Sequence, residues 1–249
     1  RDPGRCWDVN MAGLRGVLDV LARLGEDGTR RRIVWPSSIA AFGPLPEGDE
    51  PEALPNEHPL LPTTMYGVTT VAGELLGAYY AAKQGVDFRS LRFPGLLSAT
   101  EPGGGSSDYA NEMFFAAARG EPAVEVFVRP DARIPFMHMD DAVRSLRLLA
   151  DADEQALTRR TYNVTSFAPT AEEIAAAIVA EGHALAVSYE PDHRQAIVDS
   201  WPADMDDRTA RADWAWRPAL DLAATTRKLI ASIREADAGA EPAEQAAEG

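Results

Sequence analysis

Strand-like and helix-like segments alternate along most of this 249-residue chain. Short apolar stretches rich in β-branched and aromatic residues are followed by longer stretches with helical periodicity. The strand-like stretches are residues 31–38, 86–93, 123–128, 161–165 and 185–190, and the helix-like ones are 7–24, 65–83, 108–120, 139–151, 170–182 and 220–234. This alternation predicts an α/β fold with a mostly parallel, doubly wound sheet, in which ligands bind at the carboxyl ends of the strands.

The charge balance and the single cysteine narrow the class of protein. With 24 Lys and Arg against 39 Asp and Glu, the net charge is -15, and no basic stripe is available for nucleic acid. No apolar run reaches the roughly 18 residues of a membrane span, and no signal-peptide pattern opens the sequence. Cys6 has no partner for an internal disulfide, and His58 and His138 lack the spacing of metal ligands. We therefore expect a cytoplasmic protein that binds no metal, no nucleic acid and no membrane.

A serine and a tyrosine form the first candidate site. Ser38 closes the strand 31–38, and Tyr66 lies in the first turn of the helix 65–83. A hydroxyl and a phenol can jointly polarise a carbonyl or alcohol oxygen, with the phenol exchanging the proton. A phenol with a pKa of about 10 needs a nearby cation to act as a base near neutrality, and a lysine four residues along the helix would supply it. Thr70 occupies that position. Taken alone, Tyr66 also fits an ordinary core or interface residue.

Seven sequence blocks occur in an order that is typical of one enzyme superfamily. They are WDVNMAGLRGVLDV, VWPSSIAAFGP, PTTMYGVTTVAGELL, VDFRSLRFPGLLS, GGGSSDYANEMF, IPFMHMDDAVRSL and YEPDHRQAIVDSWPADMDD. Through these blocks the chain resembles the extended short-chain dehydrogenases and, more narrowly, the L-threonine 3-dehydrogenases among them. The resemblance extends from about Trp7 to Ile233. It implies NAD as the cofactor and L-threonine as the small-molecule substrate, oxidised at C3 to 2-amino-3-oxobutanoate.

The resemblance implies catalytic roles around the serine and the tyrosine. Tyr66 would accept the proton from the threonine 3-hydroxyl, and Ser38 would hydrogen-bond at the same oxygen. Ser37 would lie beside it, near the substrate. Asn10 would match the asparagine that helps to hold the active-site water and lysine, with a solvent-exposed helix position as the alternative.

The resemblance also implies where the cofactor would be bound. Pro94, Gly95 and Leu96 would line the nicotinamide, together with Tyr66 and the residue at position 70.

The substrate site is implied in two further loops. Ser106, Ser107 and Asp108 would contact the polar end of threonine, although Ser107 and Asp108 also form a good N-cap for the following helix. Trp201 would close over the substrate or, alternatively, serve only in packing.

Two departures from the family pattern bear on activity. Thr70 replaces a lysine, and the loss of a charge that moves a pKa by about 1–3 units would lower the rate about ten- to thousandfold. No G-x-G-x-x-G or G-x-x-G-x-x-G turn follows a strand, and the sequence begins in what resembles a later helix. We therefore expect a fragment of a longer enzyme or the product of a decayed gene, or else a chain whose missing half another chain supplies.

The resemblance divides the chain into three parts. Residues 1–95 would be the later part of the NAD-binding Rossmann domain without its N-terminal strands. Residues 96–234 would be mainly the smaller substrate-binding domain, with some segments returning to the Rossmann sheet, and 235–249 a disordered acidic tail. Helices near 7–24 and 65–83 match those of the superfamily's intersubunit four-helix bundle, so a homodimer is expected.

Two other functions stay open. A sugar-nucleotide epimerase or dehydratase on the same fold would need basic residues to bind a diphosphate, and Arg129 and Arg133 are candidates. A catalytically inactive remnant, acting only as a binding or dimerisation module, would account for Thr70 and for the missing glycine-rich turn.

Overall fold

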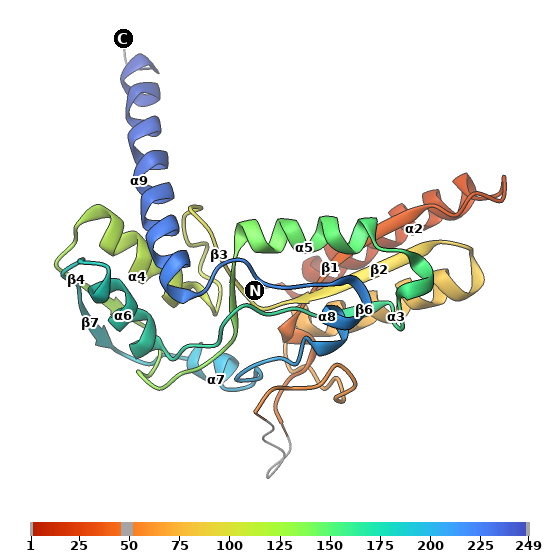
Figure 1. Ribbon diagram of the computed structural model, residues 1–249, viewed down its shortest axis with the longest axis horizontal. Helices are drawn as coiled ribbons and strands as arrows, with labels where there is room; N and C mark the ends of the chain where they lie inside the picture. Colours follow the sequence, from red (N-terminus) through yellow and green to blue (C-terminus); the bar gives the residue numbers. More distant parts are fainter. Residues whose placement is uncertain (1, 46–51, 248–249) are drawn as a thin grey trace. The chain divides into compact units, whose positions relative to one another are not determined.

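The computed structural model describes residues 2–45 and 52–247. It divides into two compact units, and each is described by itself. Unit 1 consists of Arg1–Pro94, Ala142–Thr165 and Ser200–Arg217, and unit 2 of Gly95–Asp141, Ser166–Asp199 and Pro218–Gly249. Figure 1 labels the helices and strands of both units.

Unit 1 is built on a three-stranded parallel sheet with the order β1-β2-β6. Its strands are β1 (Arg32–Ser38), β2 (Asp87–Phe93) and β6 (Thr161–Asn163). Every residue of β2 is buried, which is typical of the central strand of a parallel sheet that is covered on both faces. Because all three strands run in the same direction, their carboxyl ends lie at one edge. The predicted parallel α/β architecture is therefore confirmed.

Helices cover both faces of this sheet (Figure 1). α3 (Met65–Lys83) packs on the face that carries Phe88. On the other face, the guanidinium of Arg89 donates to the carbonyls of Leu149 and Ala152, at and just beyond the end of α5 (Met139–Asp151), at 2.6 and 2.7 Å. A cation in this position stabilises the negative end of the helix. The remaining elements of unit 1 are α1 (Pro3–Trp7), η1 (Asp8–Ala12), α2 (Gly13–Leu24), η2 (Ile39–Ala41), η3 (Glu154–Ala156) and α8 (Arg208–Trp214).

Unit 2 carries two pairs of parallel strands and three longer helices. β3 (Gly95–Leu97) pairs with β5 (Phe136–His138), and β4 (Ala123–Val126) pairs with β7 (Ala186–Tyr189). The helices are α4 (Asp108–Arg119), α6 (Ala171–Ala180), the short α7 (Gln195–Val198) and α9 (Leu222–Ala247). The predicted capping box at the start of α6 is confirmed, since Thr170 and Glu173 each accept a backbone N–H from the other.

Two segments differ from the sequence-based expectation. The single helix expected over 7–24 is α1, a π-helical turn η1 and α2 in succession, and a one-residue widening of this kind leaves little trace in the apolar periodicity. Helix α9 extends to Ala247, so the described part of the segment expected to be disordered, from residue 235 on, is helical. Arg119 of α4 donates to both carboxylate oxygens of Asp237 there, at 3.0 and 3.1 Å.

Three glycines bring α3 unusually close to the sheet. A Cβ added at Gly67 would lie 2.2 Å from the carbonyl oxygen of Ala40, one at Gly73 would lie 2.4 Å from the Trp35 ring, and one at Gly77 would lie 2.2 Å from the Phe88 ring. All three distances are shorter than any real contact. The glycines are therefore required by the approach of the helix, and this approach carries Tyr66 toward the end of β1.

We expect Gly77→Ala to destabilise the protein by about 1–3 kcal/mol, because the methyl group has no space against Phe88. Gly16→Ala in α2 is the matched control, since nothing lies within 4 Å of its added Cβ. The control is expected to be neutral or to gain up to about 1 kcal/mol from helix propensity. Urea unfolding of both variants measures the difference, and equal midpoints would contradict the close approach of α3.

Candidate active site

Tyr66 and Ser38 meet where β1 ends and α3 begins. The helix starts at Met65, and its N-cap Thr64 accepts the N–H of Gly67 at 3.0 Å, so Tyr66 lies in the first turn. Ser38 is the last residue of β1, and its hydroxyl lies near the Tyr66 phenol, whose pKa it lowers by hydrogen bonding. As a whole residue Tyr66 is half exposed, at 50%, whereas its phenol is desolvated. The phenol therefore lies beside Ser38 and is shielded from bulk solvent.

The backbone orients the Ser38 hydroxyl. Its oxygen accepts the N–H of Ala40 at 3.2 Å, which caps the short helix η2. With an acceptor site of the oxygen occupied in this way, the Ser38 proton is free to be donated to the oxygen of Tyr66. Such a bond favours the phenolate over the phenol.

The surroundings of Tyr66 nevertheless favour the neutral phenol. Desolvation raises the pKa of Tyr66 above its usual value, the hydrogen bond with Ser38 lowers it by less, and an electrostatic contribution from Cys6 raises it again. The group is therefore protonated near neutrality. It can donate a hydrogen bond or a proton there, and it becomes a base only at higher pH.

Position 70 supplies no charge to this pair. Thr70 is 4% exposed, and its hydroxyl donates to the carbonyl of Gly67 at 2.7 Å within the same helix. The hydroxyl is thus occupied by the backbone of α3, and a threonine carries no cation. The described residues therefore fit the reacting end of a nicotinamide cofactor at Tyr66 and Ser38, but not at position 70, where the family pattern has a lysine.

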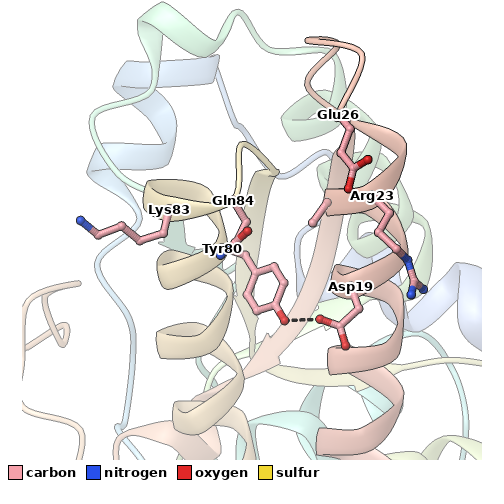
Figure 2. A pocket seen from close by; sticks show the side chains of 8 residues that line it. Asp19, Arg23, Glu26, Tyr80, Lys83 and Gln84 are labelled. Carbon is pink, nitrogen blue, oxygen red and sulfur yellow. Dashed lines mark hydrogen bonds between the residues drawn. The ribbon is translucent and has the colours of Figure 1, made fainter.

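Lys83 does not replace the missing lysine. It lies at the opposite end of α3 from Tyr66, beside a pocket of about 480 Å³ between the ends of α2 and α3 (Figure 2). In this pocket the Tyr80 hydroxyl donates to Asp19, which raises the pKa of Tyr80, and Lys83 points away from that pair. The pocket has charges of both signs on its walls and shares no residue with the Tyr66 site.

Asn10 is linked to Tyr66 through a neighbouring threonine. Its side-chain amide donates to the Thr69 hydroxyl at 2.9 Å and to the Cys6 sulfur at 3.5 Å. The Thr69 hydroxyl in turn donates to the Tyr66 carbonyl at 2.8 Å. Asn10 lies in the π-helical turn η1, and turns of this type are frequent at functional sites. Its expected role in holding a water stays a prediction, and Thr69 and Cys6 are neighbours that the sequence patterns did not indicate.

Ser37 is turned into the protein. The sequence resemblance placed it near the substrate, but it is 3% exposed, and its hydroxyl donates to the carboxylate of Glu74 at 2.5 Å. Glu74 also forms a buried ion pair with Arg92, at 2.7 Å. The sequence does contain a signal for this buried ion pair. One charged residue lies inside each of two apolar segments, Glu74 in GELLGAYY and Arg92 in SLRF. Charges in such positions are typical of buried, paired groups.

Trp201 packs in unit 1. It lies against an apolar cluster of Ile39, Phe42, Leu54 and Met205 and is itself only partly buried. The structure thus shows packing for Trp201, and its contact with substrate stays a prediction.

In unit 2 the residues after Pro94 are held by backbone pairing. The Gly95 N–H donates to the Pro135 carbonyl at 3.0 Å, and a Cβ at Gly95 would lie 2.6 Å from the Phe136 ring. The carbonyl of Leu96 accepts the Asn111 amide at 3.3 Å. Gly95 is therefore required by packing, and Asn111 fixes the expected nicotinamide segment without having been identified from the sequence.

The expected substrate segment lies at the start of α4. Ser107 occupies the N-cap position but makes no side-chain capping bond, while Asp108 accepts the N–H of Gly105 at 2.8 Å. Ser106, Ser107 and Asp108 are all partly exposed. Ser107 therefore does not have the capping role that was its alternative. Its Cβ lies 3.4 Å from the position of a Cβ on Gly95, so the two expected segments of unit 2 are neighbours.

Arg129 and Arg133 are engaged with carboxylates. Arg129 donates to both oxygens of Asp199, at 2.9 and 3.0 Å, and Arg133 pairs with Glu173 at 3.1 Å. They are not available to a diphosphate without breaking these pairs. Among residues 2–45 and 52–247, no cluster of His, Cys, Asp and Glu could hold a metal ion, and none of the helices there combines the length and apolar character needed to cross a bilayer.

Comparison with known proteins identifies the family. The model of the NAD dependent epimerase/dehydratase family matches residues 1–165. The mitochondrial L-threonine 3-dehydrogenase of Bos taurus is 42% identical over 217 residues, or 86% of this chain, which spans 56% of that relative's length. The GalE-like L-threonine dehydrogenase of Cupriavidus necator is 40% identical with a TM-score of 0.85, over 93% of this chain and 81% of that one. A monomeric L-threonine 3-dehydrogenase from a metagenome is 38% identical with a TM-score of 0.85, over 94% and 73% of the two chains. The resemblance stated from the sequence is confirmed.

We expect Thr70→Lys to lower the pKa of Tyr66 by about 1–3 units, because it places a cation one helical turn from the phenol. The titration is followed by ¹⁹F NMR of protein that carries 3-fluorotyrosine, whose phenol titrates at lower pH than tyrosine. Tyr66→Phe assigns the signal.

Val68→Lys is the matched control for this variant, since Val68 lies on the same helix but its side chain points to another side. The control is expected to leave the Tyr66 titration nearly unchanged. A folded Thr70→Lys protein with the same Tyr66 pKa as the native chain would contradict the assignment of position 70.

Proposed function

Because the chain belongs to the NAD dependent epimerase/dehydratase family, we propose that it catalyses the NAD-dependent oxidation of L-threonine at C3 to 2-amino-3-oxobutanoate. The observation that carries this proposal is the proximity of the Ser38 hydroxyl to the Tyr66 phenol at the carboxyl end of β1. Relatives that are about 40% identical over most of the chain are L-threonine dehydrogenases, which supports the choice of substrate.

Tyr66 and Ser38 have different roles at the hydroxyl of the substrate. Tyr66, as the phenolate, accepts the proton of the 3-hydroxyl, and Ser38 donates a hydrogen bond that holds the reacting oxygen and the phenolate together. NAD, when bound, supplies the hydride acceptor. Asn10, through Thr69, fixes the first turn of α3 that carries Tyr66.

Ser106, Ser107 and Asp108 of unit 2 contact the polar end of threonine, and Pro94, Gly95 and Leu96 line the nicotinamide. The partial exposure of the residues from Ser106 to Asp108 and the proximity of Ser107 to Gly95 support this assignment. Trp201 closes over the substrate.

Two alternative functions are less well supported. A sugar-nucleotide epimerase would require free cations, whereas Arg129 and Arg133 are paired with carboxylates. An inactive remnant is favoured by Thr70 and by the missing glycine-rich turn, and a Thr70→Lys variant that stays inactive would support it.

The proposal predicts L-threonine-dependent NADH formation by the protein isolated from its source cells, measured by absorbance. The rate is expected to rise about tenfold per pH unit below the raised pKa of Tyr66, because only the phenolate accepts the proton. Tyr66→Phe should abolish the activity, and Tyr189→Phe in β7 of unit 2 should leave it intact.

Inhibition by UDP-sugars that compete with threonine would instead support the epimerase function. Absence of threonine-dependent NADH at every pH, in the native chain and in Thr70→Lys, would overturn the proposed activity.

We further propose that the chain forms a homodimer through α2 and α3. Large apolar side chains are exposed on these helices and on the adjoining π-helical turn: Val9, Val17, Val20, Leu24, Leu75 and Tyr79. Leu75 is 67% exposed, and exposed apolar surface of this extent is typical of an interaction site.

Multi-angle light scattering tests the dimer. The native chain is expected to have the mass of two chains, and Leu75→Glu is expected to reduce it to one, because a carboxylate would be buried without a partner. Val179→Glu in α6, where the side chain is 53% exposed, should leave the dimer intact. A monomeric native chain, like the relative described as monomeric, would contradict the proposal.

A further inference from the structure

A buried carboxylate joins three elements below the Tyr66 site. Glu74 of α3 accepts the Ser37 hydroxyl at 2.5 Å and two guanidinium N–H groups of Arg92, at 2.9 and 2.7 Å. The side chains of Arg92 and Glu74 are 6% and 7% exposed. Ser37 and Arg92 are direct cross-strand partners in β1 and β2, so one carboxylate fastens the helix to the ends of both strands.

The third strand and a loop are attached to the same group. Arg92 also donates to the carbonyl of Asn56 at 2.9 Å, and the Asn56 side chain accepts the N–H of Asn163 in β6 at 2.7 Å. The Asn163 amide donates to the Leu54 carbonyl at 3.1 Å. The network therefore runs from α3 through β1 and β2 to β6, along the edge at which the strands end.

The location of Glu74 couples this network to Tyr66. Ser37 directly precedes Ser38, and Glu74 follows Tyr66 by eight residues on a continuous helix, about two turns. The glycines at 67 and 73 let the backbone of this part of the helix lie close to the sheet. A glycine contact fixes how near the helix lies, but it does not fix how far the helix slides along the strand. The bond from Ser37 to Glu74 supplies that restraint.

We propose that Glu74 is a positioning residue, which acts through Ser37 to set the position of the Ser38 hydroxyl relative to the Tyr66 phenol. It touches neither substrate nor cofactor. Arg92 holds the carboxylate in place, and Ser37 transmits its position to the next residue of β1. This role rests on the proposed function only for the reaction that Tyr66 serves, because Ser38 lies near Tyr66 in the free protein.

Ser37→Ala is the informative substitution, because it removes the bond to Glu74 and leaves the ion pair with Arg92 intact. Removing Glu74 itself would leave Arg92 as an unpaired buried charge, which is strongly destabilising. Ser90→Ala is the matched control. Ser90 is also a fully buried serine, it lies in the neighbouring strand β2, and its hydroxyl has no hydrogen-bond partner.

The readout is the titration of Tyr66, followed by ¹⁹F NMR with 3-fluorotyrosine in the free protein. Ser37→Ala is expected to raise the Tyr66 pKa by up to about one unit, the size of one net hydrogen bond, and Ser38→Ala to raise it at least as much. Ser90→Ala is expected to leave it unchanged. In a Ser38→Ala background, Ser37→Ala should have no further effect, because the bond that it positions is already gone.

An unchanged Tyr66 titration in Ser37→Ala would overturn the proposal, as would an equal shift with and without Ser38. A general loosening of the fold would shift the titration in both backgrounds and would also lower the melting temperature. Neither threonine nor NAD enters the measurement, so its failure and a failure of the proposed activity are separate results. Once threonine-dependent turnover has been measured for the native chain, Ser37→Ala is expected to lower kcat and to leave KM nearly unchanged.

Discussion

The carboxylate of Glu74 is the group on which the arrangement of unit 1 depends. A guanidinium and a carboxylate are stable away from water only when nearly all of their hydrogen-bonding positions are filled. Glu74 and Arg92 meet this requirement with Ser37, Asn56 and Asn163, and these partners come from two strands and a loop. The need to satisfy one buried charge pair thus brings the ends of separate segments together, and the exposed face of that assembly carries Tyr66.

Two effects act in opposite directions on the pKa of Tyr66. Desolvation disfavours the phenolate, and the hydrogen bond with Ser38 favours it by less. In a protein with a cation at position 70, the balance would move toward the phenolate. Here the Thr70 hydroxyl is hydrogen-bonded within α3, and it does not shift the balance between phenol and phenolate. The departure at one position therefore changes the protonation of the site without disturbing its geometry.

Elements that depend on periodicity could be predicted from the sequence, whereas side-chain partners could not. The helix from Met65 to Lys83 and the strand ending at Ser38 agree with their predicted bounds, and Thr64 caps the start of the helix. The direction of Ser37 was not predictable, since adjacent serines at a strand end face opposite sides and only the position of Glu74 decides which is buried. The link from Asn10 to Thr69 joins residues that are 59 positions apart and passes through a π-helical turn, which no local pattern indicates.

Helix α3 differs from most helices that pack on a sheet, because its large apolar side chains point away from the sheet. Its sheet side consists of glycines, threonines and a glutamate, and Leu75 and Tyr79 point outward. The main chain of α3 therefore lies directly against residues of the sheet. Substitutions at the inner positions of the helix are poorly tolerated for this reason. Across an evolving family, this asymmetry predicts that the inner positions of α3 change only together with Ala40, Trp35 or Phe88. The apolar outer side is free of that constraint, and Leu75 and Tyr79 are constrained only by the proposed dimer contact.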